Sequence, residues 1–129
     1  MDSGVLHTLL NLITFRDLEG HPKLGASLEG FILEQVIHRL GARTEECFFW
    51  ATHGGAELDL LVVRGRKRLG FEIKRTSSPR LTSSMRSALS DLSLKSLYII
   101  HAGDETFQME KLVWAFALSR LLKGLNPLR

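Results

Sequence analysis

Residues 56–75 read AELDLLVVRGRKRLGFEIKR, and this stretch decides the fold. Apolar and polar residues alternate on either side of Gly65 and Arg66, which is typical of two antiparallel strands joined by a tight turn. Glycine at the first of two loop positions favours a type II′ turn. We therefore predict a β-hairpin with strands over residues 56–64 and 67–75.

The two-residue loop determines which residues face each other across the hairpin. Counting back from the turn places Asp59 opposite Glu72. The same count places Glu57 opposite Lys74 on the same face. Three apolar pairs then share the other face, which supports this register. The three pairs are Leu58 with Ile73, Leu60 with Phe71, and Val62 with Leu69.

A long helix is predicted before the hairpin. Apolar residues recur at helical spacing from residue 24 to residue 40, and Gly41 stands where helices commonly end. Further upstream, residues 5–12 predict a short helix. Residues 16–23 predict a polar link in which Pro22 interrupts helical structure.

The remaining segments complete a sheet covered by helices. Strands are predicted over residues 46–52 and 95–101, and a helix is predicted over residues 80–92. A turn is predicted over residues 103–105. The apolar segment over residues 111–122 reads as a strand passing into a short helix. The order αβββαβ predicts one α/β domain over residues 1–129, with a mixed central sheet flanked by helices. Its parts are a helix and link over 1–20, a core over 24–101 and a strand or helix over 107–129.

The facing carboxylates of Asp59 and Glu72 carry the predicted chemistry. Two carboxylates about 5 Å apart repel each other unless a cation lies between them. Oxygen ligands favour Mg²⁺ or Mn²⁺, and the backbone carbonyl of Ile73 supplies a further oxygen. Lys74 then faces the water that attacks a phosphodiester, where it lowers the pKa of that water or stabilises charge on the phosphoryl oxygen.

Glu29 is the third candidate carboxylate. It projects into the middle of the apolar stripe of the predicted long helix, whereas Glu34 points to the polar side. A carboxylate among core-facing residues is costly unless it is paired, hydrogen-bonded or bound to a metal. We therefore expect Glu29 to join Asp59 and Glu72 at the metal site.

This constellation resembles the PD-(D/E)XK nuclease superfamily, whose core has the restriction-endonuclease-like order αβββαβ. By that resemblance Glu29, Asp59, Glu72 and Lys74 occupy the active-site positions, although Leu58 replaces the proline of the motif. The wider text also resembles the uncharacterised carboxy-terminal domain of a family of prokaryotic AAA-type ATPases. It comprises GASLEGF at 25–31, GAELD at 55–59 and FEIKR at 71–75.

The resemblance to ATPases leaves one part of those proteins unaccounted for. The chain contains no GxxxxGK(S/T) phosphate loop, so it lacks the nucleotide-binding domain that such proteins carry at their amino terminus. We expect either a separate ATPase partner or the loss of a fused ATPase domain. The sequence does not choose between a stand-alone product, a degraded reading frame and an excised domain.

Several other polar residues are secondary candidates for binding phosphate, metal or substrate. Arg75, Arg80 and Arg86 are candidates for phosphate binding, or they are cations on a solvated helix face. Glu57 is a secondary candidate ligand, or it forms a cross-strand ion pair with Lys74. His53 is a secondary candidate for substrate contact or proton transfer, although such a histidine is more often structural.

Composition restricts the cellular context. Seventeen Lys and Arg against fourteen Asp and Glu give a net charge of +3, which permits contact with nucleic acid without requiring it. Cys47 is the single cysteine, so a disulfide framework is excluded. The sequence has no apolar run of about 20 residues and no basic signal segment, which favours a cytoplasmic protein without a membrane partner.

Three functions follow from these observations. The first is a metal-dependent nuclease that binds DNA and hydrolyses its phosphodiesters at the Glu, Asp and Glu-x-Lys residues. The second is a non-catalytic nucleic-acid-binding or regulatory module of an AAA-type ATPase. The third is a protein-interaction domain that uses the apolar segment at 112–122, which includes Trp114 and Phe116.

For the aromatic residues we predict packing in the core. These residues are Phe48, Phe49, Trp50, Trp114 and Phe116.

Overall fold

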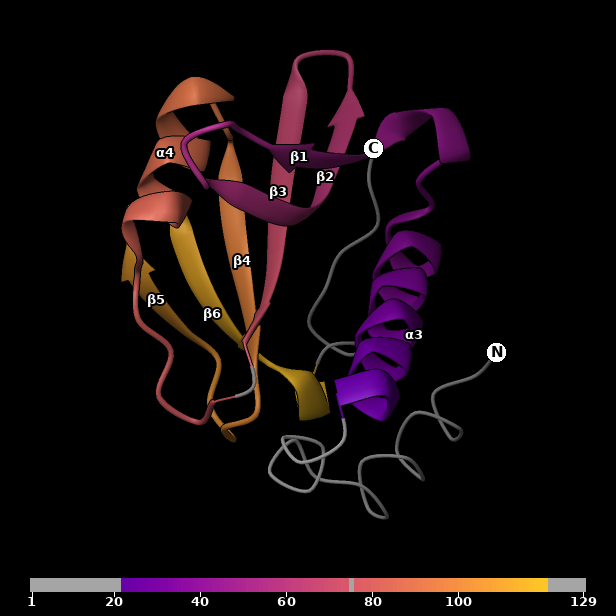
Figure 1. The fold of residues 1–129 in the computed structure, drawn as a ribbon, viewed down its shortest axis with the longest axis vertical. Helices are drawn as coiled ribbons and strands as arrows, with labels where there is room; N and C mark the ends of the chain where they lie inside the picture. Colours follow the sequence, from indigo (N-terminus) through magenta and orange to yellow (C-terminus); the bar gives the residue numbers. More distant parts are fainter. Residues whose placement is uncertain (1–21, 75, 121–129) are drawn as a thin grey trace.

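Figure 1 shows the fold in a computed structural model, which describes residues 22–74 and 76–120, with side chains from residue 28 onward. The helices are α3 (Pro22–Leu40) and α4 (Ser83–Asp91), with single 3₁₀ turns at Thr44–Glu46 and Leu118–Arg120. The strands are β1 (Cys47–Ala51), β2 (Glu57–Arg64), β3 (Lys67–Lys74), β4 (Ser96–His101), β5 (Phe107–Glu110) and β6 (Val113–Ala117). The predicted order αβββαβ is confirmed. The helix predicted over residues 5–12 lies outside the described residues.

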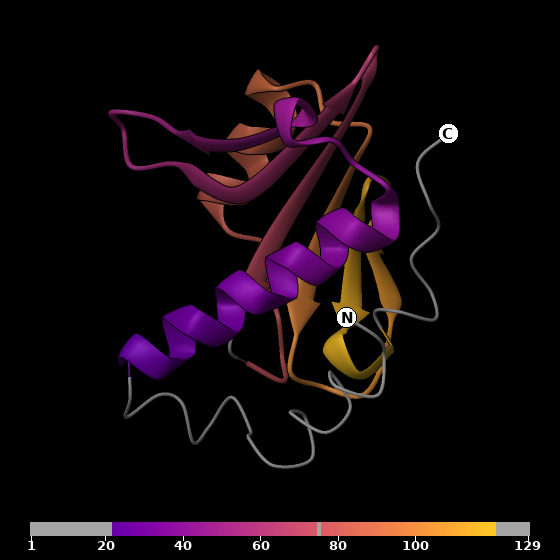
Figure 2. The ribbon, with the colours of Figure 1, turned by 90° about the vertical axis from the view of Figure 1, so that its right-hand side faces the viewer.

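The six strands form one mixed sheet in the order β1-β2-β3-β4-β6-β5. The neighbours β3, β4 and β6 run parallel, whereas β1 with β2, β2 with β3, and β5 with β6 are antiparallel. Helix α3 covers one face of the sheet and α4 lies against the other, as Figures 1 and 2 show from two directions. The predicted α/β class with a mixed central sheet is confirmed.

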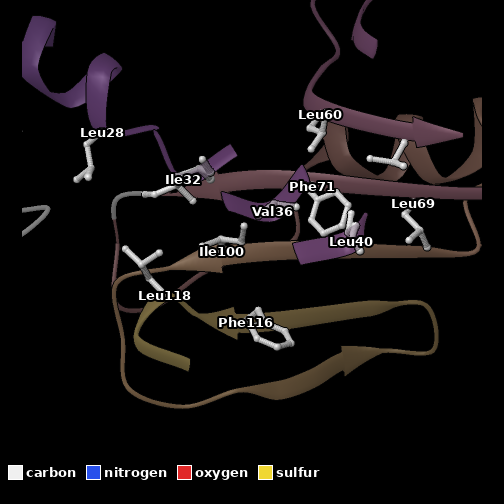
Figure 3. Close-up of a cluster of buried hydrophobic side chains, with 12 residues drawn as sticks. Leu28, Ile32, Val36, Leu40, Leu60, Leu69, Phe71, Ile100, Phe116 and Leu118 are labelled. Atoms are coloured by element: carbon white, nitrogen blue, oxygen red, sulfur yellow. The ribbon is translucent and has the colours of Figure 1, made fainter. Parts of the chain in front are cut away.

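The first hydrophobic core lies between α3 and the sheet (Figure 3). Four apolar residues at intervals of four along α3 point at the strands, so each turn of the helix contributes one side chain. These residues are Leu28, Ile32, Val36 and Leu40. On the sheet they meet Leu60, Val62, Leu69, Phe71, Ile73, Ile100 and Phe116. Full burial of each such side chain contributes about 2 kcal/mol, which fixes α3 on this face.

The second core lies beneath α4. Met85 and Ala88 of α4 pack against apolar residues of β2, β4 and β6 on the face opposite α3. Gly70 of β3 leaves room for Leu94, which follows α4 in the chain, because a Cβ at position 70 would lie 2.8 Å from Leu94 Cδ1. The sequence therefore needs glycine at this buried strand position.

The predicted hairpin register is confirmed near the turn. Arg64 pairs with Lys67, and the pairing continues in step to Leu60 with Phe71. Gly65 has a φ of +60°, as the first loop position of a type II′ turn requires. The two-residue loop thus sets the register that the alternation of apolar residues predicts.

The prediction for Leu58 is wrong. Leu58 was expected to share a face with Leu60, but it belongs to the core under α4 whereas Leu60 faces α3. The β1–β2 register shifts here, because three steps along β2 from Leu58 to Leu61 oppose two steps along β1 from Trp50 to Phe48. An extra residue of this kind reverses the inside–outside alternation.

Two element boundaries and one additional strand differ from expectation. Pro22 does not interrupt helical structure but begins α3, where its missing N–H costs no hydrogen bond. Helix α4 begins at Ser83 rather than residue 80, because Thr82 caps it by accepting a hydrogen bond from Met85 N–H. Strand β5 was not predicted, and it pairs with β6 at one edge of the sheet. The segment after it is a strand ending in a 3₁₀ turn, as expected up to Arg120.

Three of the aromatic residues expected in the core are exposed. Phe48 and Phe49 are 49% and 67% exposed because β1 is an edge strand of the described sheet. Trp114 is 37% exposed, whereas Phe116 is buried as predicted and Trp50 is half-buried. Aromatic content indicated a strand correctly, but the position of that strand at an edge was not visible in the sequence.

Candidate functional site

The site forms where the regular pairing of β2 with β3 ends. The paired register stops at Leu60 and Phe71, and the next residue of β2 is Asp59. Asp59 Oδ2 accepts a hydrogen bond of 2.8 Å from the backbone N–H of Ile73. The carboxylate therefore takes the place of a strand-to-strand hydrogen bond, and this holds Asp59 beside the residues that follow Phe71.

Glu72 lies next to Asp59 and is buried, with 7% of the residue exposed. Its Oε1 lies 3.8 Å from Lys74 Nζ. Its Oε2 is buried and, within the described part of the chain, has no hydrogen-bond partner. A buried carboxyl oxygen without a partner is uncommon in native proteins and indicates a missing ion, water or proton.

Burial raises the pKa of Glu72 to about 7 from its ordinary value of 4.5. The charge of Asp59 contributes to this rise, and the ammonium of Lys74 partly offsets it. Near neutral pH the two forms of Glu72 are therefore similarly populated. The site as it stands favours a proton, or another cation, beside this carboxyl group.

Burial also raises the pKa of Asp59, and the hydrogen bond from Ile73 N–H opposes that effect. The negative charge of Glu29 raises the pKa of Asp59 as well, and Lys74 lowers it. Glu29 is half-buried on α3. The charges of Glu29 and Lys74 thus act on Asp59, and the charge of Asp59 in turn acts on Glu72.

The donor chemistry suits a hard divalent cation only in part. Asp59 and Glu72 offer carboxylate oxygens, and the orphaned Oε2 of Glu72 is available to a cation. However, across residues 22–74 and 76–120 no three His, Cys, Asp or Glu side chains stand close enough together to hold a metal ion. Asp59 and Glu72 would therefore supply only two carboxylates to a Mg²⁺ or Mn²⁺ ion, and other oxygen ligands would have to complete its coordination.

The structure ties the start of β2 to α4 through Ser84, a residue that sequence reasoning missed. Glu57 N–H donates to Ser84 Oγ at 2.9 Å, and the Ser84 hydroxyl donates to Glu57 O at 3.2 Å. The side chain of Glu57 is exposed, and Lys74 forms its ion pair with Glu72 rather than with Glu57. The predicted Glu57–Lys74 ion pair is therefore wrong, because Glu72 lies closer to that lysine.

Of the candidate phosphate-binding arginines, the two in the described part of the chain, Arg80 and Arg86, form no ion pair with Asp59 or Glu72. Arg80 is exposed before α4, and Arg86 is exposed and forms an ion pair of 3.0 Å with Glu110. Arg75 lies outside the described residues. Nothing in their geometry assigns phosphate contacts to Arg80 or Arg86.

The histidines take different positions. His53 is exposed in the turn between β1 and β2. His101 is 1% exposed, its Nδ1 accepts from Gly103 N–H at 3.0 Å, and its Nε2 lies 2.8 Å from Glu105 O. Both ring nitrogens of His101 are thus occupied in holding the turn after β4, which is a structural role.

Comparison with known proteins places this fold in a family without assigning it an activity. An uncharacterised protein of Mycobacterium bovis and one of Mycobacterium tuberculosis are each 45% identical over 121 residues, which is 94% of this chain. The chain spans only 27% of the length of these relatives. No solved structure matches. In the described ranges, no helix has the combination of length and apolar character needed to cross a membrane. The family model for a domain of unknown function, DUF4143, matches residues 24–121, and the chain belongs to that family.

Proposed function

We propose that this domain is a metal-dependent nuclease that hydrolyses DNA phosphodiesters at Asp59, Glu72 and Lys74. The observation that carries the proposal is the buried Oε2 of Glu72, which has no partner among the described residues and lies next to a second carboxylate. Such an arrangement weakens the fold unless a cation is present. Proteins keep such destabilising features at functional sites.

Each residue has a role that its position supports. Asp59 and Glu72 would hold Mg²⁺ or Mn²⁺, which would polarise the phosphoryl oxygen and favour attack by water. Asp59 is held in place by its hydrogen bond to Ile73 N–H. Lys74 is partly exposed and lies 3.8 Å from Glu72, so its ammonium can face both the carboxylate and an approaching phosphate. The charge of Glu29 reaches Asp59 from α3, which suits a further ligand or a group that orients water.

The test is a cleavage assay with purified protein and single-stranded, duplex and branched DNA in Mg²⁺ or Mn²⁺. The Glu72→Ala and Lys74→Ala variants are expected to lose about 100-fold or more in rate, as is typical when a group that stabilises transition-state charge is removed. Glu34→Ala is the matched control, because Glu34 is exposed on α3. Cleavage that persists unchanged in the Glu72→Ala and Lys74→Ala preparations would be a contaminant and would count against the proposal.

A second candidate is a non-catalytic nucleic-acid-binding or regulatory module that serves an AAA-type ATPase. Two observations favour it. Within the described residues no three metal-ligating side chains are assembled, and the relatives continue well beyond the length of this domain. Salt-dependent DNA binding with no cleavage in either metal would support this candidate over the nuclease.

A further inference from the structure

Basic residues gather at the end of the sheet where the parallel strands β3, β4 and β6 begin. This end of β3 is opposite to the end that carries Glu72. The turn between β2 and β3 lies at the upper end of the molecule in Figure 1. We call the basic residues that follow Gly65 or precede β4 and β6 the basic edge. Its members are Arg66, Lys67, Arg68, Lys95 and Lys111.

The parallel topology brings these cations together from three separate segments. Lys95 N–H donates to Arg68 O at 2.8 Å, so these two residues are direct neighbours. Lys111 lies two residues before Val113, which pairs with Leu97, and Lys95 lies two residues before Leu97. Since neighbouring strands lie about 4.8 Å apart, the basic edge forms a row across β3, β4 and β6.

The cations of the basic edge carry charge that the described residues do not neutralise. Among residues 22–74 and 76–120, no carboxylate forms an ion pair with any of the five. Arg68 donates to the carbonyl of Leu92, which holds the guanidinium without cancelling its charge. Glu110, beside Lys111 in sequence, is paired with Arg86. Asp91, next to Leu92, subtracts one charge, so a net excess of positive charge remains.

The hairpin that carries three of the five cations is anchored to neighbouring elements. The hairpin turn is regular from Arg64 and Lys67 onward. Arg64 is not part of the basic edge, because Glu46 accepts from its Nε and Nη2 at 2.8 and 2.9 Å. Arg64 Nη2 also donates to Gly41 O, which anchors the hairpin to the end of α3. Arg66 and Arg68 are therefore exposed on a hairpin that is anchored to the rest of the fold.

We propose that the basic edge is a contact surface for the phosphate backbone of nucleic acid. An unpaired row of Lys and Arg matches a polyanion, and contacts of this kind position nucleic acid without reading its sequence. The choice of nucleic acid over an acidic protein rests on the proposed nuclease function. Glu72 lies four positions after Arg68 in the same strand, and therefore on the same face of the sheet, about 13 Å away. That distance corresponds to about four base pairs of duplex, so one substrate running along the hairpin reaches both places.

The test measures binding, so that it stays independent of cleavage. A fluorescein-labelled 20-base-pair duplex is titrated in EDTA at 50 to 200 mM KCl, and anisotropy gives Kd. The variants are Lys95→Glu, Lys111→Glu and the triple variant Arg66→Ala, Lys95→Ala, Lys111→Ala. Arg120→Glu is the matched control, because Arg120 is exposed beyond the other end of β6 and the change in charge is the same as in either single variant.

The triple variant is expected to bind about tenfold or more weakly at 100 mM salt, with a salt dependence shallower by about 2 to 3 in slope. Arg120→Glu is expected to bind within about twofold of wild type. Circular dichroism confirms that each variant is folded. The inference fails if wild type does not bind the duplex, if Arg120→Glu loses as much affinity as Lys95→Glu, or if polyglutamate competes as well as unlabelled DNA. A protein that binds through the basic edge but never cleaves would refute the nuclease proposal alone.

Discussion

Replacing Glu72 by glutamine should stabilise the metal-free protein above neutral pH. The fold raises the pKa of Glu72 from 4.5 to about 7, chiefly because the carboxyl group is buried. Between these two values the folded state binds more protons than the unfolded state, so stability falls as pH rises through that window. Glutamine has nearly the same shape as the protonated acid and never acquires the charge. The Glu72→Gln variant therefore does not lose stability as pH rises through this window.

The size of the effect follows from the same shift. A change from 4.5 to about 7 corresponds to about 3 kcal/mol, and partial solvent screening reduces this to about 2 kcal/mol. At pH 5 most of the wild-type folded state is already protonated, so the two proteins should have similar stability. At pH 8.5 the variant should be more stable by about 2 kcal/mol, since the charged Oε2 of wild type has no partner in the described structure.

Urea unfolding in EDTA at pH 5 and pH 8.5, followed by circular dichroism, measures this difference. Glu34→Gln serves as the control, because the same chemical change on an exposed helical position should give a difference near zero at both pH values. If the stability of Glu72→Gln relative to wild type is the same at both pH values, the fold does not hold Glu72 preferentially protonated. The physical reasoning about the site would then be wrong.

Two further predictions concern the scaffold around the site. Gly70→Ala should destabilise the protein by about 1 to 3 kcal/mol, because the new Cβ would lie 2.8 Å from Leu94 Cδ1 in a packed core. Gly30→Ala is its control in a urea titration, since a Cβ there meets nothing within 4 Å and helix propensity improves; equal losses would contradict the packing argument. The hydrogen bonds from Arg64 lower the pKa of Glu46 from 4.5 to about 2, so the charged carboxylate stabilises wild type and this contribution is lost as pH falls from 4.5 to about 2. The Glu46→Gln variant should lack this contribution at every pH. Thermal melting from pH 7 to pH 2 tests this, and identical acid profiles for variant and wild type would refute it.

Local patterns in the sequence predicted much of the fold. The four-residue spacing from Leu28 to Leu40 identified α3 and the face it buries. The position of Gly65 fixed the turn, and through it the register from Arg64 to Leu60. The regular pairing ends at Leu60 and Phe71, so the placement of Asp59 directly opposite Glu72 stays a prediction, although the hydrogen bond from Ile73 N–H holds the Asp59 carboxylate beside that part of β3.

Features that depend on distant parts of the chain were not predictable in this way. Leu58 changed faces because β1 pairs with β2 out of step, which the sequence of β2 alone does not reveal. Phe49 was expected in the core, but β1 lies at an edge of the described sheet. Ser84 lies 27 positions from Glu57, and no local signal connects the two. Such contacts are set by topology rather than by periodicity.

The candidate site also depends on contacts between residues far apart in the sequence, because helices on both faces of the sheet help to position it. Asp59 stands where β2 leaves β3, and α3 brings the charge of Glu29 to it from one side. From the other side, Ser84 of α4 holds both backbone groups of Glu57, two residues before Asp59. A displacement of α4 would therefore shift Asp59 relative to Glu72, which is fixed within β3 by its pairing with β4. The separation of the two carboxylates, and so the affinity for the cation that we propose they bind, depends on how α4 packs against the sheet.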